Sequence, residues 1–422
     1  MLNYFATNHL GLDTMSIENL VARWRAETPG CAYCVHLNNA GAGLMPEPVI
    51  DAMRDHIALE SEIGGYEAAD ARAESIHSTY ADIARLLNAK ATNIAIVANA
   101  TAGFIQSMTS FDFARGDVIV TTKADYTSYQ IQYLSLSKRL GVEIVHAEDL
   151  PEGGVDPESV RALAANPRCR LVHVSWIPTH SGLVQDAEAV GSVCEQLGVP
   201  YLVDACQAVG QLPIDVERLR CDYLSVTARK FLRGPRGIGF LFASDRALAR
   251  GDHPLFVDMR GAKWTGANEY AVAESAVRYE DWEFAYALVL GLGAAVRYAS
   301  QVGIDTARAR SWSLARGLRS ELAALDGVRV LDRGNQQSAI VTADIVGIDA
   351  TNLVTELRKR GINTAASLAW YGLLDFSARG VLSAIRISPH YYNTNEEILV
   401  AVGAIDEIAR SKRHVRRVDT AT

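Results

Sequence analysis

Residues 225–240, "SVTARKFLRGPRGIGF", place two basic side chains between an apolar strand and a glycine-rich turn. The run at residues 221–228 is rich in apolar residues, which is typical of a strand buried inside a parallel sheet. Arg229 and Lys230 follow that run directly. Because a charge at the end of a buried strand needs solvent or an anionic partner, this stretch predicts a ligand-binding edge of the sheet.

Short apolar runs alternate with helical patterns up to about residue 250. This alternation predicts an α/β fold with a mostly parallel seven-stranded sheet that is covered by helices on both faces. The expected strands lie at residues 93–100, 117–123, 142–147, 170–177, 199–207, 221–228 and 237–244, with helices at 76–88, 102–110, 127–140 and 186–197. Such sheets bind ligands at the carboxyl ends of their strands. Residues at those ends are Asn99, Asp125, Thr179, Asp204 and Lys230.

The pattern changes after about residue 250. Residues 251–270 suggest loops, long helices are expected at 282–302 and 304–325, and weaker alternations lead to a closing helix at 395–411. We therefore predict three parts: an N-terminal segment (1–35), a large ligand-binding domain (36–280) and a smaller C-terminal α/β domain (281–422).

Composition argues against several classes of function. The 422-residue chain has a formal net charge of −8, which disfavours general binding to nucleic acids or anionic membranes. Neither an apolar run of about 20 residues nor a secretion signal is evident, so we expect a cytoplasmic protein with reduced cysteines. The CAYC pair at 31–34 is a weak redox signal. No HExxH, second CxxC or GxSxG motif supports a metal site or serine hydrolysis, and no metal is expected.

Lys230 and Asp204 end two successive predicted strands, so both lie at the same edge of the sheet. An aldehyde cofactor with a pyridine ring and a phosphate requires such residues, since a lysine forms the Schiff base and a carboxylate keeps the ring nitrogen protonated. The pair therefore favours pyridoxal 5′-phosphate (PLP).

The segment "ANATAGFIQSM" at residues 98–108 fits the phosphate of this cofactor. A helix opens here directly after a strand, so the backbone around Ala100 can face an anion and Thr101 adds a hydroxyl. Thr227 and Arg229 flank the lysine and can bind the same group. Taken alone this segment is a weak signal, because Thr or Asn before a helix is usually an N-cap. Asp204 alone could likewise be a strand-end cap, Gln207 a helix-surface residue and Arg386 half of an ion pair. The turn "GPRGIG" does not match GxGxxG, which disfavours a dinucleotide site.

The run "VDACQAVGQLPIDV" followed by "CDYLSVTARKFLRGPRGIGFL" resembles the class V aminotransferase family of fold-type I PLP-dependent enzymes. The similarity extends from "HLNNAGAGLMP" (36–46) to "AIRISPHYYNTNEEI" (384–398). This resemblance implies Lys230 as the Schiff-base lysine, Asp204 as the partner of the pyridine nitrogen and Gln207 as a donor to the ring hydroxyl. It further implies Tyr126 as the ring-stacking residue and Arg386 as the binder of the substrate α-carboxylate. The remaining cofactor contacts would be Ala100, Thr101, Thr179, Thr227 and Arg229.

Segments at 60–70, 176–182 and 227–237 resemble the branch with hercynylcysteine sulfoxide lyases and isopenicillin-N-epimerase-like proteins. Desulfurases of the family use a cysteine in the loop that here spans 363–384, which contains none. The resemblance thus implies a C–S lyase that eliminates from a cysteine-type conjugate through an external aldimine and a Cα-deprotonated quinonoid, with Lys230 as the base and Tyr126 assisting. Epimerisation, transamination and γ-elimination or replacement remain alternatives, as does an inactive binding protein.

Fold-type I enzymes place their site at a dimer interface, so the resemblance implies a homodimer. Asn39, Ala40 and Gly41 would line the substrate side, and Tyr66 would arrive from the partner subunit. The usual glycine–threonine–proline turn that reaches the neighbouring phosphate is replaced by "RYEDWEF" (278–284), in which Trp282 is a candidate pocket wall.

Overall fold

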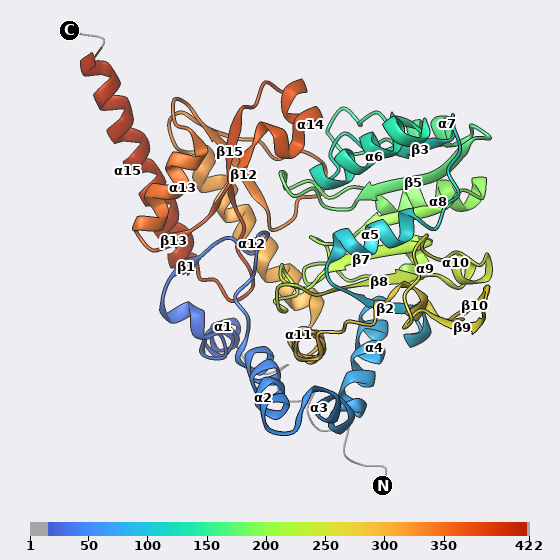
Figure 1. Ribbon diagram of the computed structural model, residues 1–422. Helices are drawn as coiled ribbons and strands as arrows, with labels where there is room; N and C mark the ends of the chain where they lie inside the picture. Colours follow the sequence, from blue (N-terminus) through green and yellow to red (C-terminus); the bar gives the residue numbers. More distant parts are fainter. Residues whose placement is uncertain (1–15, 420–422) are drawn as a thin grey trace.

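The computed structural model describes residues 16–419 and the side chains up to residue 412. Its centre is a seven-stranded sheet in the order β2-β8-β7-β6-β5-β3-β4 (Figure 1). All neighbouring strands are parallel except at β8, which is antiparallel to both of its neighbours. The prediction of a mostly parallel seven-stranded sheet is confirmed. The strands are β2 (Ile94–Val97), β3 (Val118–Thr121), β4 (Glu143–His146), β5 (Cys169–Ser175), β6 (Tyr201–Asp204), β7 (Tyr223–Thr227) and β8 (Gly239–Ala243).

Alternate residues of these strands belong to two separate apolar layers, one on each face of the sheet. On β7, for example, Tyr223 belongs to the layer beneath α5 (Ala100–Met108) and α6 (Thr127–Leu140), whereas Leu224 belongs to the large core on the opposite face. That opposite face is covered by α4 (Ala73–Leu87), α7 (Pro157–Ala164), α8 (Ala187–Leu197) and α11 (Tyr286–Val302). Burial on both faces explains why the strands are apolar along their whole length.

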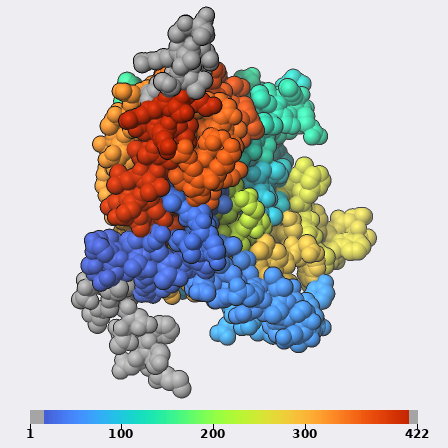
Figure 2. Space-filling model, turned by 90° about the vertical axis from the view of Figure 1, so that its left-hand side faces the viewer, coloured from blue at the N-terminus to red at the C-terminus, as the bar shows by residue number. Residues whose placement is uncertain are grey.

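The C-terminal part contains an antiparallel sheet in the order β11-β12-β15-β14. Its strands are β11 (Val328–Val330), β12 (Val341–Ile345), β14 (Ala365–Leu368) and β15 (Ser383–Ile387), and its helices are α12 (Ile304–Ala323), α13 (Ala350–Lys359), α14 (Leu373–Ala378) and α15 (Asn395–Asp419). The N-terminal segment joins this part, because β1 (Val35–His36) pairs in parallel with β13 (Ile362–Asn363). Figure 2 shows the blue N-terminal segment against the orange and red C-terminal part. The division into three parts at residues 35 and 280 stays a prediction.

Three helices precede the large sheet in the chain: α1 (Ile17–Ala26), α2 (Glu47–Ile63) and α3 (Gly65–Ala71). Two short helices lie in the segments that connect or follow its strands: α9 (Val216–Leu219) and α10 (Asp245–Ala249). Helix α11 packs on α2 and α4. Among the described residues, no single helix is long and apolar enough to cross a membrane. Only α11 and α12 taken together reach that length, and they are bent by 78°.

One element was not predicted. The loop-rich stretch at residues 251–270 also contains an antiparallel hairpin of β9 (Ala262–Gly266) and β10 (Glu269–Val272). Most residues of both strands are exposed. Since no face of this hairpin is buried in the chain, its sequence lacks the apolar alternation that marks a strand.

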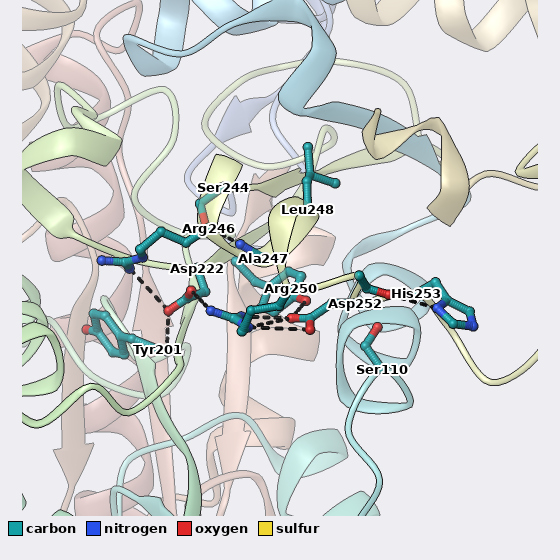
Figure 3. Close-up of polar contacts among 12 residues, drawn as sticks. Ser110, Tyr201, Asp222, Ser244, Arg246, Ala247, Leu248, Arg250, Asp252 and His253 are labelled. Atoms are coloured by element: carbon teal, nitrogen blue, oxygen red, sulfur yellow. Dashed lines mark hydrogen bonds and ion pairs between the residues drawn. The ribbon is translucent and has the colours of Figure 1, made fainter. Parts of the chain in front are cut away.

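The amino-terminal edge of the large sheet, opposite Lys230, is held by the buried carboxylate of Asp222 (Figure 3). Asp222 accepts hydrogen bonds from the backbone N–H of Tyr201 (3.0 Å) and from the guanidinium groups of Arg246 (3.2 Å) and Arg250 (2.7 Å). These contacts lock the starts of β6 and β7 to the segment that contains α10.

We expect Asp222→Ala to destabilise the fold by about 2–3 kcal/mol, because it leaves the Tyr201 N–H and two arginines without their shared acceptor. The arginines keep part of their hydration, which limits the loss. Urea unfolding measures this change. An unchanged unfolding midpoint would contradict this role.

Candidate active site

Lys230 and Asp204 lie together at the carboxyl edge of the large sheet. Asp204 ends β6 and pairs with Ser225 of β7, and Lys230 follows the end of β7. Both residues are buried, Lys230 with 8% exposure and Asp204 with 7%. Burial lowers the pKa of Lys230, and the nearby Asp204 carboxylate opposes this effect. The site therefore contains an amine that is easier to deprotonate than a solvated lysine.

The Asp204 carboxylate is held in a fixed orientation. Its Oδ1 accepts the backbone N–H of Cys206 at 2.9 Å, and its Oδ2 accepts the Ser175 hydroxyl at 3.4 Å. The Ser175 oxygen in turn accepts the backbone N–H of Tyr126 at 3.3 Å. Tyr126 precedes α6, and its ring centroid lies 6.0 Å from Lys230 Nζ. The predicted stacking residue, lysine and carboxylate are thus brought together.

The start of α5 supplies the expected anion-binding backbone. Asn99 caps this helix by accepting the N–H of Ala102 at 3.0 Å, which leaves the amides of buried Ala100 and half-buried Thr101 at the helix entrance. Thr227 is buried at the end of β7. Arg229 donates to the carbonyl oxygen of Gly41, and its pKa is lowered by burial and by repulsion from Arg236.

A second group of polar residues surrounds Arg386 on β15. Its Nη1 donates to the carbonyl oxygen (3.0 Å) and hydroxyl (2.8 Å) of Thr179, and its Nη2 donates to Asn38 Oδ1 at 3.2 Å. Gln207 Nε2 donates to the same Thr179 hydroxyl and to the Ala40 carbonyl, both at 3.1 Å. Burial and repulsion from Arg229 lower the pKa of Arg386 to about 10.

Two of the predicted residues are not brought to this cluster by their side chains. Tyr66 lies on α3 and is 71% exposed. Asn39 is fully buried, but it donates to the Ser388 carbonyl and accepts from the Tyr392 hydroxyl. The neighbouring Asn38 contacts Arg386 instead, and we missed it because the sequence "NN" does not reveal which asparagine faces inward. Substrate contacts by Asn39 and Tyr66 stay predictions.

Ser175 was also missed. It ends β5 between the ends of β3 and β6 in the sheet, so its position at a strand end was the available signal. Its hydroxyl links Tyr126 to Asp204, as described above.

The charges of the cluster indicate what it can bind. Lys230, Arg229 and Arg386 all have pKa values lowered by burial, and Asp204 is the nearby carboxylate. Arg386 Nε and Gln207 Oε1 are buried without a hydrogen-bond partner among the described residues. An excess of buried and half-buried cations, together with two unpartnered polar atoms, favours anionic and polar ligand groups. A phosphate, a ring hydroxyl and a substrate carboxylate meet these requirements.

Comparison with known proteins gives the family. The Aminotransferase class-V model matches residues 35–400. The chain belongs to the class-V aminotransferase family. A probable cysteine desulfurase from Methanothermobacter thermautotrophicus is 25% identical to it over 91% of this chain and 97% of that protein. A probable hercynylcysteine sulfoxide lyase from Mycobacterium tuberculosis is 26% identical over 93% of this chain and 94% of that protein.

The solved structure of C-DES, with glycine covalently linked to its PLP cofactor, superposes with a TM-score of 0.81. It is 23% identical and covers 90% of this chain and 98% of its own. The fold is therefore that of fold-type I. This class-V protein is a PLP-dependent enzyme, either a lyase or a transferase. The lysine, carboxylate and unpartnered polar atoms described above fit that cofactor.

We expect Lys230→Met to stabilise the cofactor-free class-V enzyme at neutral pH by about 1–2 kcal/mol, since a buried ammonium is removed. The native pKa of Lys230 is lowered, so the folded state binds fewer protons than the unfolded state. The parent should thus gain stability as the pH rises from that lowered value towards the ordinary 10.5. The difference in the free energy of unfolding between parent and variant should therefore narrow as the pH rises. Calorimetry at pH 7 and pH 10 tests this. A gap that widens with pH would contradict it.

Proposed function

We propose that this enzyme is a C–S lyase that removes the sulfur substituent of a cysteine-type conjugate by β-elimination. The observation that supports this choice most directly is the segment at 363–384. It occupies the place where desulfurases resembling this chain carry a nucleophilic cysteine, and it contains none. Without that thiol, sulfur leaves with its own substituent rather than being transferred to the protein.

Contacts with Thr127 and His180 hold this segment in place against the large domain. The Thr127 hydroxyl, next to Tyr126, donates to the carbonyl oxygen of Tyr371 at 2.6 Å. Buried His180 lies 3.4 Å from the Asp375 carboxylate and packs edge-on against Phe376. A side chain at Gly372 would meet the His180 ring at 2.6 Å, so the segment packs closely on the loop that contains Thr179.

Cys206 lies near Lys230, since its backbone N–H donates to the Asp204 carboxylate. Its thiol is buried, and burial raises its pKa well above the usual range, with the Asp204 carboxylate adding to the effect. A thiol that stays protonated is a poor nucleophile. This environment supports elimination over persulfide transfer.

In the proposed reaction the chain's residues bind, orient and move a proton. PLP, when bound, withdraws electrons from the α-carbon of the amino acid that it holds. Lys230 Nζ takes the α-proton, because its lowered pKa makes this amine easier to deprotonate than a solvated lysine. Asp204 keeps the pyridine nitrogen protonated. Arg386 binds the α-carboxylate with its unpartnered Nε and an Nη group.

The same proposal assigns the remaining cofactor contacts. Tyr126 would stack on the ring, Gln207 would bind the ring hydroxyl, and Thr101, Thr227 and Arg229 would bind the phosphate with the amides at Ala100. Thr179 links the ring side to Arg386 through the hydroxyl that both Gln207 and Arg386 contact. The Ala40 carbonyl oxygen accepts a hydrogen bond from Gln207, and the Gly41 carbonyl oxygen accepts one from Arg229. Both residues therefore lie next to proposed cofactor contacts.

The relatives support the chemistry, since both cysteine desulfurases and a hercynylcysteine sulfoxide lyase are named for removing sulfur groups from cysteine derivatives. The test is to incubate PLP-loaded protein with S-substituted cysteines. β-Elimination consumes one water and releases a thiol, pyruvate and ammonium in equal amounts. Alanine formed from free cysteine, with sulfur bound to protein, would contradict the proposal.

The alternative outcomes have their own products. Transamination requires an added keto acid and transfers the amino group to it, epimerisation inverts the α-carbon without releasing pyruvate, and γ-elimination yields a four-carbon keto acid. Binding of PLP and amino acid without any of these products would indicate an inactive binding protein.

We also propose a homodimer, in which Tyr66 reaches the site of the partner subunit. Large apolar side chains lie exposed on and around the β9–β10 hairpin, as expected of an interface: Leu255, Phe256, Met259, Trp264, Tyr270 and Trp282. Light scattering should give twice the chain mass of 45.8 kDa. A monomer at micromolar concentration would contradict this assembly.

A further inference from the structure

Arg233 is the largest fully buried side chain close to the proposed cofactor lysine, with 1% exposure. It closes the turn that follows Lys230, because its backbone N–H donates to the Lys230 carbonyl oxygen at 2.9 Å. Its φ of +61° lies in the left-handed region, which is uncommon for residues other than glycine. The contacts of its side chain hold this turn in place.

The guanidinium group of Arg233 is held entirely by uncharged partners. Nε donates to the Leu44 carbonyl (2.7 Å), Nη1 to the Tyr391 hydroxyl (2.5 Å) and Nη2 to the Thr28 hydroxyl (2.6 Å). In the described part of the chain it forms no ion pair with a carboxylate. Such burial of a cation is costly unless every donor is satisfied.

Three tyrosine rings surround the same group. Its central carbon lies 4.5 Å from the ring centroid of Tyr392, 5.2 Å from that of Tyr391 and 5.5 Å from that of Tyr298. Desolvated cation–π contacts of this kind offset part of the cost of burial. We refer to Arg233, Thr28, Tyr298, Tyr391 and Tyr392 as the arginine cage.

The arginine cage connects the lysine turn to two distant parts of the chain. Thr28 belongs to the N-terminal segment, 205 positions away, and Tyr391 follows β15, the strand that contains Arg386. His390, beside Tyr391, donates from Nε2 to the Phe231 carbonyl at 2.8 Å. The turn after Lys230 is thus bonded from both sides.

Close backbone packing reinforces these bonds. The N–H of Gly43 donates to the Arg229 carbonyl at 2.8 Å, and a Cβ at Gly43 would come within 2.7 Å of the Lys230 carbonyl oxygen. Gly210 has a φ of +92°, and a Cβ there would lie 2.3 Å from the carbonyl carbon of Phe231. The backbone on both sides of the lysine is therefore clamped.

We propose that Arg233 is a positioning residue for Lys230, and that the arginine cage fixes the lysine relative to the strand that contains Arg386. This role rests on Lys230 being the PLP lysine, but it does not depend on which reaction follows. Because the PLP dissociation constant and the pH midpoint of the absorbance are measured without substrate, failure of the C–S lyase assay would leave it standing.

The test compares Arg233→Met with Arg278→Met as a matched control. Arg278 is also buried and also held by carbonyl oxygens, those of Ala273 (2.8 Å) and Asp252 (2.9 Å) among them, near the opposite edge of the sheet. For Arg233→Met we expect at least a ten-fold weaker PLP dissociation constant. We also expect a shift of half a unit or more in the pH midpoint of the visible absorbance of PLP-loaded protein. Arg278→Met should lose thermal stability and keep both properties.

Two milder variants keep the test decisive if Arg233→Met does not fold. Tyr391→Phe removes one hydrogen bond to the guanidinium while keeping the ring, and Thr28→Val removes another from far along the chain. Each should shift the same pH midpoint in the same direction and lower kcat three- to ten-fold with KM within two-fold. If all three variants only lowered Tm, with the pH midpoint and PLP binding of the parent, Arg233 would have no positioning role.

Discussion

Replacing Lys230 with alanine should lower kcat for the cysteine conjugate by about 10⁴-fold or more. The variant loses both the amine that holds the cofactor and the base that takes the α-proton, and general-base catalysis alone contributes about 10² to 10⁴-fold. Since the side chain is buried beside Asp204, water cannot readily replace it. Steady-state release of pyruvate measures the loss.

Lys90→Ala is the matched control for this loss. Lys90 is an exposed lysine that pairs with Asp245 near the amino-terminal edge of the sheet, so its removal should leave kcat within two-fold of the parent. External amines should partly restore the activity of Lys230→Ala if the missing function is proton transfer. A Lys230→Ala protein that turned over within ten-fold of the parent would contradict the assignment.

Replacing Asp204 with asparagine should lower kcat by about 10²- to 10³-fold while the shape of the side chain is kept. The carboxylate, fixed by the Cys206 N–H and the Ser175 hydroxyl, is the group that can hold a proton on the ring nitrogen. An amide cannot stabilise that charge, and loss of one preorganised electrostatic partner costs about this much in other enzymes. Steady-state kinetics with saturating PLP measures the change.

Asp222→Asn provides the control for Asp204→Asn. Asp222 is also a buried carboxylate, but it lies just before β7, at the edge of the sheet opposite Asp204. It should lower the free energy of unfolding and leave kcat nearly unchanged. Equal loss of kcat in the two variants would show that stability, rather than the proposed proton on the ring nitrogen, explains the effect.

The parts of the site that were predictable lie at strand ends. Lys230 and Asp204 each follow a continuous apolar run, and parallel strands bring such ends to one edge. Arg386 and Gln207 were assigned from resemblance, and the structure adds that they share the Thr179 hydroxyl.

What could not be predicted depends on contacts distant in the sequence. The Arg233 guanidinium bonds to residues 158 and 205 positions away, and no periodicity reports such pairs. Asn38 and Asn39 differ only in which way each side chain points. The β9–β10 hairpin was not predicted because its strands are mostly exposed, so their sequence shows no alternation of apolar and polar residues.

The most direct test of the central claim is to load the protein with PLP, reduce it with borohydride and map the modified peptide by mass spectrometry. The account predicts a phosphopyridoxyl group on the peptide that contains Lys230, and no such group in Lys230→Ala. Modification of another lysine in place of Lys230, or of none in a protein saturated with PLP, would contradict it.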